Sequence, residues 1–256
     1  MDPLKSSSRC YKPNLFNSFP NIVAAQSTRL GGVSPPPFES LNLGFFTNDH
    51  FQNVRENRIR FFSDLGFTEG EVVGSFQIHE DRILTAHEAK QYENYDAIIT
   101  TEKNLLLTVT LADCVPVLIY DAEKEVVAAI HAGWRGTDAE IVRKTLEKMH
   151  YKYGSKGENC FAYIGTCIDE SSFEVGNIVA KRFEASFKRW DETKQKFFVD
   201  LKKANEAQLL EFGLPKSQIE ISPYSTVINN ETYFSHRKEN GQTGRMLAVI
   251  GMKNNP

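Results

Sequence analysis

The stretch ADCVPVLIYDAEKEVVAAIHAGWRGT, residues 112–137, contains two apolar runs rich in β-branched residues, separated by a charged segment. This pattern predicts a β-hairpin. A turn centred between Ala122 and Glu123 places Cys114 directly opposite His131, and directly opposed Cβ atoms lie roughly 4.5–5.5 Å apart. The hairpin therefore predicts a thiol beside an imidazole, which suits shared metal ligation or a thiolate–imidazolium pair.

Similar runs elsewhere predict a strand-rich chain with helices between the strands. The predicted strands are 22–27, 72–78, 105–111, 115–120, 126–131, 160–165 and 246–251. The predicted helices are 51–65, 174–190, 201–212 and one that follows the hairpin. In this last helix Thr137 and Glu140 have capping-box spacing, and Gly154 is the predicted end. Its apolar positions recur on one face: Ile141, Val142, Thr145, Leu146 and Met149.

These elements predict a fold that mixes helices and strands, of the broad α/β class and more specifically α+β. We expect a layered sandwich of mixed sheets with helices outside. The chain has 256 residues, of which 41% are hydrophobic and 25% charged, an ordinary globular composition. We therefore expect a single domain over residues 1–256, in which residues 1–20 form a more loosely packed N-terminal segment.

The composition also limits the kinds of partner. A formal net charge of −3 argues against a nucleic-acid polymer, because proteins that bind one usually carry a concentrated basic face. The N-terminal sequence MDPLKSSSRCYKP leads into no apolar segment, and no run is long enough to span a bilayer. No CxxC pair occurs among the four cysteines. We expect a cytoplasmic protein with free thiols, no membrane partner and a small-molecule substrate.

Two of the six histidines, His79 and His131, end apolar strand-like runs. Together with Cys114 they give a set of two imidazoles and one thiolate. Such a set suits Zn²⁺ and leaves the fourth tetrahedral position open for water or substrate. A second interpretation makes Cys114 a nucleophile activated by His131, as in a cysteine hydrolase or deamidase. A third is a buried thiol with two hydrogen-bonded core histidines.

Arginines stand beside glycines in two further segments, TRLGGVS at 28–34 and GQTGRM at 241–246. A guanidinium next to a flexible backbone can bind phosphate through its fork of donors and free N–H groups. The alternative for Arg29 and Arg245 is a surface turn with a solvated arginine. Arg237, in YFSHRKENG, allows the same two interpretations.

Ten segments occur in an order typical of one family. They are STRLGGVS, SLNLG, QIHED, DAIIT, ADCVPVLIYD, AIHAGWRGT, IGTCI, FEVG, YFSHR and TGRM, between residues 27 and 251. The chain closely resembles the laccase-domain family, also called the YfiH or multicopper polyphenol oxidase-like family. The resemblance implies a YfiH-like single-domain fold and a zinc ion held by His79, Cys114 and His131.

The resemblance also implies purine nucleoside phosphorylase activity, in which adenosine, inosine or guanosine reacts with phosphate to give free base and ribose 1-phosphate. Adenosine deaminase and methylthioadenosine phosphorylase are implied side activities. Our candidates for binding phosphate are Arg29, Arg245 and Arg237. Asn42 is our candidate for a hydrogen bond to the ribose or the base. Asp113, which adjoins the catalytic and metal-binding Cys114, is a candidate acid–base residue for deamination.

Other functions stay open at this point. The family name is also linked to peptidoglycan editing, which implies a cell-wall precursor as substrate, and a non-catalytic zinc-binding module is a further alternative. A copper oxidase is disfavoured, because its trinuclear cluster needs many histidines and this chain has six and no HxH pair. Zinc is therefore the expected cofactor rather than copper. The segment FFTNDH and His236 depart from the family pattern, which points to a difference in substrate preference.

Overall fold

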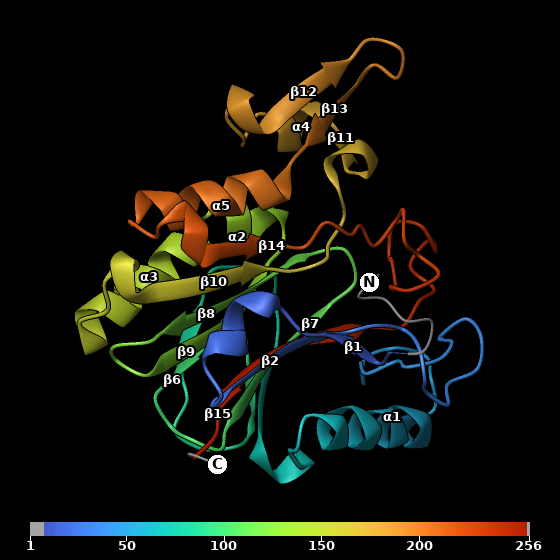
Figure 1. The fold of residues 1–256 in the computed structure, drawn as a ribbon. Coiled ribbons are helices and arrows are strands. Elements are labelled where there is room, and N and C mark those ends of the chain that lie inside the picture. Colours follow the sequence, from blue (N-terminus) through green and yellow to red (C-terminus); the bar gives the residue numbers. More distant parts are fainter. Residues whose placement is uncertain (1–7, 255–256) are drawn as a thin grey trace.

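The computed structural model describes residues 8–254, whose strands form two large sheets and one small sheet (Figure 1). In the order of the first sheet, the strands are β1 (Cys10–Tyr11), β2 (Ile22–Ser27), β15 (Met246–Met252), β7 (Leu106–Leu111), β3 (Val72–Phe76) and β5 (Gln91–Glu93). The second sheet runs β14 (Ile219–Ile221), β10 (Cys160–Ile164), β8 (Val115–Asp121), β9 (Val126–Ala132), β6 (Ala97–Thr100) and β4 (Ile83–Thr85). The small sheet runs β11 (Glu174–Val175), β13 (Lys196–Val199) and β12 (Lys188–Asp191).

The helices lie outside the two large sheets (Figure 1). They are α1 (Phe51–Asp64), α2 (Trp134–Asp138), α3 (Ile141–Tyr153), α4 (Asn177–Ala180) and α5 (Leu201–Glu211). Short 3₁₀ turns occupy Asn14–Ser18, Glu69–Glu71, Gly157–Asn159, Glu170–Ser172, Ala185–Phe187 and Lys216–Gln218.

Three apolar clusters give the layers of the fold. One lies between the two large sheets and joins Leu118 of β8 to Ile250 of β15. Another packs the outer face of the second sheet against α3 and α5, and the third packs the first sheet against Phe61 and Phe62 of α1. The predicted mixed fold of layered sheets with outer helices is therefore confirmed.

The two strands of the central hairpin are buried on both faces. Residues Val117 and Ile119 of β8 point into the cluster beneath α3, whereas Leu118 and Tyr120 point between the sheets. A strand covered on both faces has no polar face to solvate, which explains why its sequence is a continuous apolar run.

The hairpin is confirmed, but its register differs from the predicted one. His131 pairs with Pro116 rather than with Cys114. The last pair at the open end joins Val115 to Ala132, so Cys114 lies just beyond the ladder.

The cause of this shift is the turn, which contains the four residues 122–125. The carboxylate of Asp121 accepts hydrogen bonds from the backbone N–H groups of Glu123 and Lys124 at 2.9 and 3.1 Å. These bonds set the turn centre one residue later than the sequence pattern suggested.

The predicted helices 51–65 and 201–212 are confirmed as α1 and α5, and α3 buries its predicted apolar face and ends at Gly154. The predicted capping box is wrong. Thr137 lies inside the short helix α2, where its hydroxyl accepts a hydrogen bond from Asn205. Glu140 begins α3 in a left-handed conformation with φ 59° and makes no side-chain cap.

The predicted helix 174–190 is also wrong, because this segment forms β11, the four-residue α4 and part of β12. Its apolar residues do not share one buried face. Val175 and Phe183 are buried, whereas Ile178 is largely exposed. In Figure 1 this part of the chain projects from the body above α5.

Part of the N-terminal segment expected to be loosely packed, residues 1–7, lies outside the described residues. From residue 8 onward the chain is packed: β1 pairs with β2, and Tyr11 and Phe16 are buried. That residues 1–256 form a single domain stays a prediction. Among residues 8–254, no helix has both the length and the apolar character that crossing a bilayer requires.

Candidate metal centre and active site

Two connections between the large sheets bring the predicted metal ligands together. The chain passes from β3 to β4 through His79, and from β7 to β8 through Cys114. His131 is the penultimate residue of β9. One ligand atom from each of the three side chains lies within 4.8 Å of the others, and the two imidazole rings meet edge to face at 4.8 Å.

A buried carboxylate, Asp96, holds this arrangement in place. It accepts hydrogen bonds from the backbone N–H groups of Ile78, His79 and Glu80 at 3.0–3.1 Å, and from Nδ1 of His131 at 2.8 Å. Burial alone raises a carboxyl pKa, but these hydrogen bonds and the His131 imidazole lower the pKa of Asp96 below its ordinary value. Because Nδ1 of His131 donates to Asp96, Nε2 keeps the lone pair that a metal needs.

Asp96 also explains a difference from the predicted strand 72–78. The strand β3 ends at Phe76, since the next N–H groups turn toward the Asp96 carboxylate instead of the sheet. His79 adopts a left-handed conformation with φ 61°, which its backbone hydrogen bond to Asp96 stabilises. The histidine therefore lies on a fixed corner beyond the strand end.

A metal ion fits among these side chains. A Cβ atom built on Gly133 would lie 3.2 Å from Cys114 Sγ, 3.5 Å from His79 Cδ2 and 3.7 Å from His131 Cε1. The glycine thus keeps the space beside all three ligands clear of protein atoms. Ligand atoms on one tetrahedral ion lie roughly 3.3–3.8 Å apart, which the observed group can reach. The three residues can therefore bind a metal.

Electrostatics favour a thiolate at this position. Burial raises the pKa of Cys114, but the His131 and His79 imidazoles outweigh it and lower the pKa to about 6. Burial likewise lowers the pKa of His131, yet the Cys114 sulfur and Asp96 raise it to about 9. Without metal, the pair is therefore a thiolate next to an imidazolium at neutral pH.

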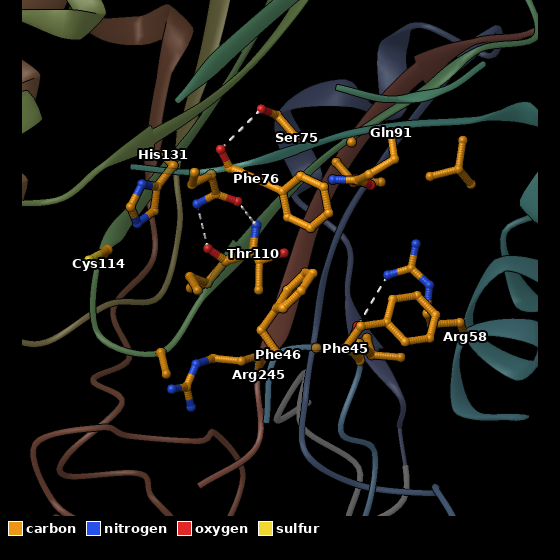
Figure 2. Close-up of a pocket in the computed structure, with 18 of the residues that line it drawn as sticks. Phe45, Phe46, Arg58, Ser75, Phe76, Gln91, Thr110, Cys114, His131 and Arg245 are labelled. Carbon is orange, nitrogen blue, oxygen red and sulfur yellow. Dashed lines mark hydrogen bonds between the residues drawn. The ribbon is translucent and has the colours of Figure 1, made fainter. Parts of the chain in front are cut away.

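The metal ligands lie at one end of a cavity of about 800 Å³ (Figure 2). Phe46 and Phe76 lie along its middle, and Arg58 and Gln91 lie at the opposite end. Arg245 lies below the middle in this view, on the side of Cys114. The cavity thus joins a metal-binding group, aromatic walls and guanidinium groups in one space.

Of the predicted phosphate ligands, Arg245 and Arg237 line this cavity. Arg245 is mostly buried and forms no ion pair with a carboxylate of residues 8–254; its Nη1 donates to the carbonyl groups of Thr243 and Gly244. Burial lowers its pKa, an effect that the Asp113 carboxylate opposes. Arg237 donates to the carbonyls of two residues outside the metal centre, Ser172 and Glu174, at 3.0 and 3.3 Å.

The other two predicted substrate ligands, Arg29 and Asn42, do not line the cavity. Arg29 forms a partly buried ion pair with Glu239 at 3.0 Å. The side chain of Asn42 is fully buried, and its Oδ1 accepts the backbone N–H of Arg245 at 2.9 Å. Both residues therefore support the loops that carry the cavity lining.

Asp113 also lines the cavity, but its carboxylate already has three protein partners. It accepts from the hydroxyl groups of Thr226 and Ser235 and from the backbone N–H of Arg237. Its backbone has φ 88°, a left-handed conformation at the corner before Cys114. These three hydrogen bonds hold the corner before Cys114 in place, and the acid–base role of Asp113 stays a prediction.

The sequence interpretation missed Asp96, Arg58 and the aromatic walls. Asp96 directly precedes the buried strand β6, in the segment DAIIT. Arg58 follows Val54 by one helical turn and precedes Phe62 by another, so it lies on the buried face of α1. A charged residue on an apolar helix face was the available signal for Arg58.

Comparisons with known proteins identify the family of this chain. A family profile described as multi-copper polyphenol oxidoreductase laccase matches residues 23–253. A purine nucleoside phosphorylase from Bacteroides thetaiotaomicron is 37% identical over 92% of this chain and 93% of its own. The purine nucleoside phosphorylase YlmD of Bacillus subtilis is 34% identical over 91% of this chain and 89% of its own.

Solved structures give the same result. The hypothetical protein YfiH of Bacillus licheniformis superposes with a TM-score of 0.92 at 30% identity, covering 99% of this chain and 100% of its own. YlmD from Geobacillus stearothermophilus gives 0.91 at 28% identity, with 98% of each chain covered. The chain therefore belongs to the multi-copper polyphenol oxidoreductase laccase family, as its sequence motifs predicted.

Proposed function

We propose that the protein is a purine nucleoside phosphorylase that converts adenosine, inosine or guanosine and phosphate to free base and ribose 1-phosphate. The observation that carries the proposal is that His79, Cys114 and His131 open onto the same cavity as the partly buried Arg245. Relatives named purine nucleoside phosphorylase, at 37% and 34% identity, support it.

Zinc is the metal that we propose for the three ligands, because one thiolate and two neutral imidazoles suit Zn²⁺ and leave an open position. When bound, the ion would supply Lewis-acid stabilisation of negative charge at this end of the cavity. Copper is the alternative suggested by the family description. The chain itself contributes Asp96, which orients His131, and Gly133, which keeps the space clear.

Arg245 is our main candidate for binding phosphate. Its guanidinium is partly buried and forms no ion pair with a carboxylate of the described residues, so its remaining donors are available to an anion in the cavity. Arg237 is a second candidate at the same end. For Arg29 and Asn42 we now propose support of the surrounding loops instead of substrate contact.

The reaction forms a bond from a phosphate oxygen to C1′ of the ribose while the bond between C1′ and N9 of the base breaks. The base leaves with the electron pair of that bond and takes up the proton that hydrogen phosphate gives up. Arg245 would hold phosphate against C1′, and fixing two reactants in this way removes much of the entropic barrier. The aromatic walls would exclude water, which otherwise competes with phosphate for C1′.

Adenosine deamination and phosphorolysis of methylthioadenosine are side activities within this proposal. A second candidate function is a cysteine hydrolase or deamidase, which the lowered pKa of Cys114, about 6, favours specifically. A peptidoglycan-precursor editing enzyme and a non-catalytic zinc-binding module are further alternatives. For each of the candidate enzymes we propose a cytoplasmic location and small-molecule substrates.

The test combines metal quantification with chromatographic product analysis for adenosine, inosine and guanosine, with and without phosphate. We expect one metal ion per chain and free base that forms only with phosphate. Activity that survives metal removal but not thiol alkylation would favour the cysteine hydrolase. Metal without any product would favour the binding module, and turnover of a cell-wall precursor alone would favour the editing enzyme.

A further inference from the structure

We propose that the end of the cavity at Arg58 binds the purine base and selects bases that carry an oxygen at C6. This inference rests on the proposed function, and it assigns the orientation of the nucleoside. The base would lie at the Arg58 end, with C1′ of the ribose directed toward Cys114 and Arg245.

The two ends of the cavity are well separated. Figure 2 shows Cys114 and His131 on one side and Arg58 and Gln91 on the other. The cavity follows β7, whose residues Thr108, Thr110 and Leu111 line it. At the usual rise per residue, the stretch from Thr108 to Leu111 alone spans roughly 10 Å. A group bound at the Arg58 end is therefore not in contact with the metal ligands.

The guanidinium of Arg58 is fixed and offers one free edge. Its carbon lies over the rings of Phe45 and Phe62, at 4.8 and 5.0 Å from the ring centres. Nη1 donates to the carbonyl of Leu43 at 3.1 Å, and Nε donates to Glu69 at 3.4 Å. Nη2 has no hydrogen-bond partner in the part of the chain from 8 to 254, although the side chain is only 11% exposed. The free donors of this edge are available to a ligand in the cavity.

The charge at this end suits a neutral acceptor better than a second anion. Glu69 forms an ion pair with Arg58 and balances its charge, whereas Arg245 at the other end forms no ion pair with a carboxylate of residues 8–254. A neutral ring with acceptor atoms on its edge would use the free donors of Arg58 without needing the full charge. We therefore assign phosphate to Arg245 and the base to Arg58.

The walls beside Arg58 suit a flat aromatic ring. Phe46 is 76% exposed, an unusual position for a large apolar side chain, and its ring packs edge to face on Phe76 at 4.7 Å. Both rings line the cavity between its two ends (Figure 2). Aromatic side chains of this kind stack on the flat faces of bases in other proteins.

Gln91 supplies a second donor at this end. With its amide oxygen toward β3, it accepts from the backbone N–H groups of Ser75 and Phe76 at 3.1 and 3.2 Å. Its NH₂ group is then left for the cavity that Gln91 lines. Arg58 and Gln91 together make this end rich in donors.

A donor-rich edge distinguishes the purines. Inosine and guanosine present two acceptors, O6 and N7, on one edge of the base, whereas adenosine replaces O6 with an amino donor. Arginine matches the first pattern with two parallel hydrogen bonds. As the C1′–N9 bond breaks, its electron pair spreads over the purine, so hydrogen bonds at O6 and N7 strengthen. Arg58 would thus favour 6-oxopurines in both binding and turnover.

The experiment removes the 6-oxygen from the ligand and the guanidinium from the protein. Binding of inosine and of purine riboside, which lacks O6, is measured by calorimetry on the metal-loaded protein, alongside turnover with phosphate. In the unmodified protein, we expect loss of O6 to weaken binding about tenfold or more. In Arg58→Met, the two ligands should bind alike, and in Arg58→Lys the difference should shrink.

Arg60→Met is the matched control, because Arg60 lies on the same helix and, within residues 8–254, pairs only with the partly exposed Glu56. It should keep the full discrimination between the two ligands. The ligand comparison in the unmodified protein tests the proposal even if Arg58→Met does not fold.

Two results would overturn the inference: equal binding of inosine and purine riboside in the unmodified protein, or undiminished discrimination in a folded Arg58→Met. Inosine 5′-phosphate serves as a further arm. If it bound tenfold more tightly than inosine in the unmodified protein but not in Arg58→Met, Arg58 would be a phosphate site and the inference wrong. If the protein did not turn over inosine with phosphate but still bound inosine more tightly than purine riboside, the phosphorylase function would be contradicted and the recognition of the base would stand.

Discussion

Asp96 and His131 form a fully buried hydrogen bond of 2.8 Å between a carboxylate and an imidazole nitrogen. The same carboxylate accepts three backbone N–H groups from the connection that carries His79. One residue thus orients one metal ligand directly and a second through its backbone. This arrangement links the two sheets at the metal centre.

Asp96→Asn should weaken metal binding about 10- to 100-fold, as loss of an outer carboxylate partner does in other metal sites. An amide offers one acceptor oxygen in place of two, so it cannot hold His131 and all three N–H groups. Metal affinity is measured by competition with a chelator, and the unfolding midpoint is recorded in parallel. Unchanged affinity in the folded variant would show that Asp96 does not organise the centre.

Gly133→Ala should weaken metal binding by pushing the Cys114 sulfur aside, with little effect on the backbone. Gly133 has φ −65°, which alanine adopts freely, but the new Cβ would lie 3.2 Å from Cys114 Sγ. Gly176→Ala is the matched control, since Gly176 also precedes a helix with φ −77° and a Cβ there meets no atom within 4 Å. Metal content of both variants, measured by atomic spectroscopy, decides the prediction. A full metal complement in Gly133→Ala would contradict it.

In the metal-free protein, iodoacetamide should alkylate Cys114 first, with a rate that rises through a midpoint near pH 6. The pKa of Cys114 is lowered to about 6, so the reactive thiolate is present above that pH and is lost as pH falls below it. Burial raises the pKa of Cys160 and Cys167 to about 12, and these thiols should stay unmodified. Mass spectrometry of the labelled peptides provides the measurement. A midpoint near pH 9 would contradict the thiolate–imidazolium pair.

Arg245→Met should raise the KM for phosphate about 10- to 100-fold, the cost of losing one or two charge-assisted hydrogen bonds. The KM for inosine should change much less, because the base would bind at the other end of the cavity. Initial rates at varied phosphate and fixed inosine give the comparison, and Arg237→Met tests the second candidate. Equal effects on both substrates would indicate a structural role for Arg245.

The sequence could predict the fold class and the ligand set because both depend on local patterns. Strands buried on two faces, such as β8 and β9, appear as continuous apolar runs. Register was harder, since it depends on the length of a turn that the Asp121 side chain sets. The error moved Cys114 out of the ladder, yet the ligands still meet because His131 and Cys114 lie at the same end of the hairpin.

The far end of the cavity was beyond prediction for a different reason. Arg58 lies on α1, Gln91 begins β5 and Phe46 belongs to a loop, so no spacing in the sequence relates them. Only tertiary packing places them beside one another. The predicted helix 174–190 failed similarly, because its apolar residues are distributed among a strand, a single helical turn and the surface.

The central claim is that a metal held by Cys114 carries the phosphorolysis of purine nucleosides. The most direct test measures metal content and phosphate-dependent release of hypoxanthine from inosine for Cys114→Ala, beside Cys10→Ala, whose cysteine lies on the edge strand β1. The account predicts that Cys114→Ala folds, loses its metal and releases no base, whereas Cys10→Ala keeps both. Full metal content and unchanged release of hypoxanthine in Cys114→Ala would contradict it.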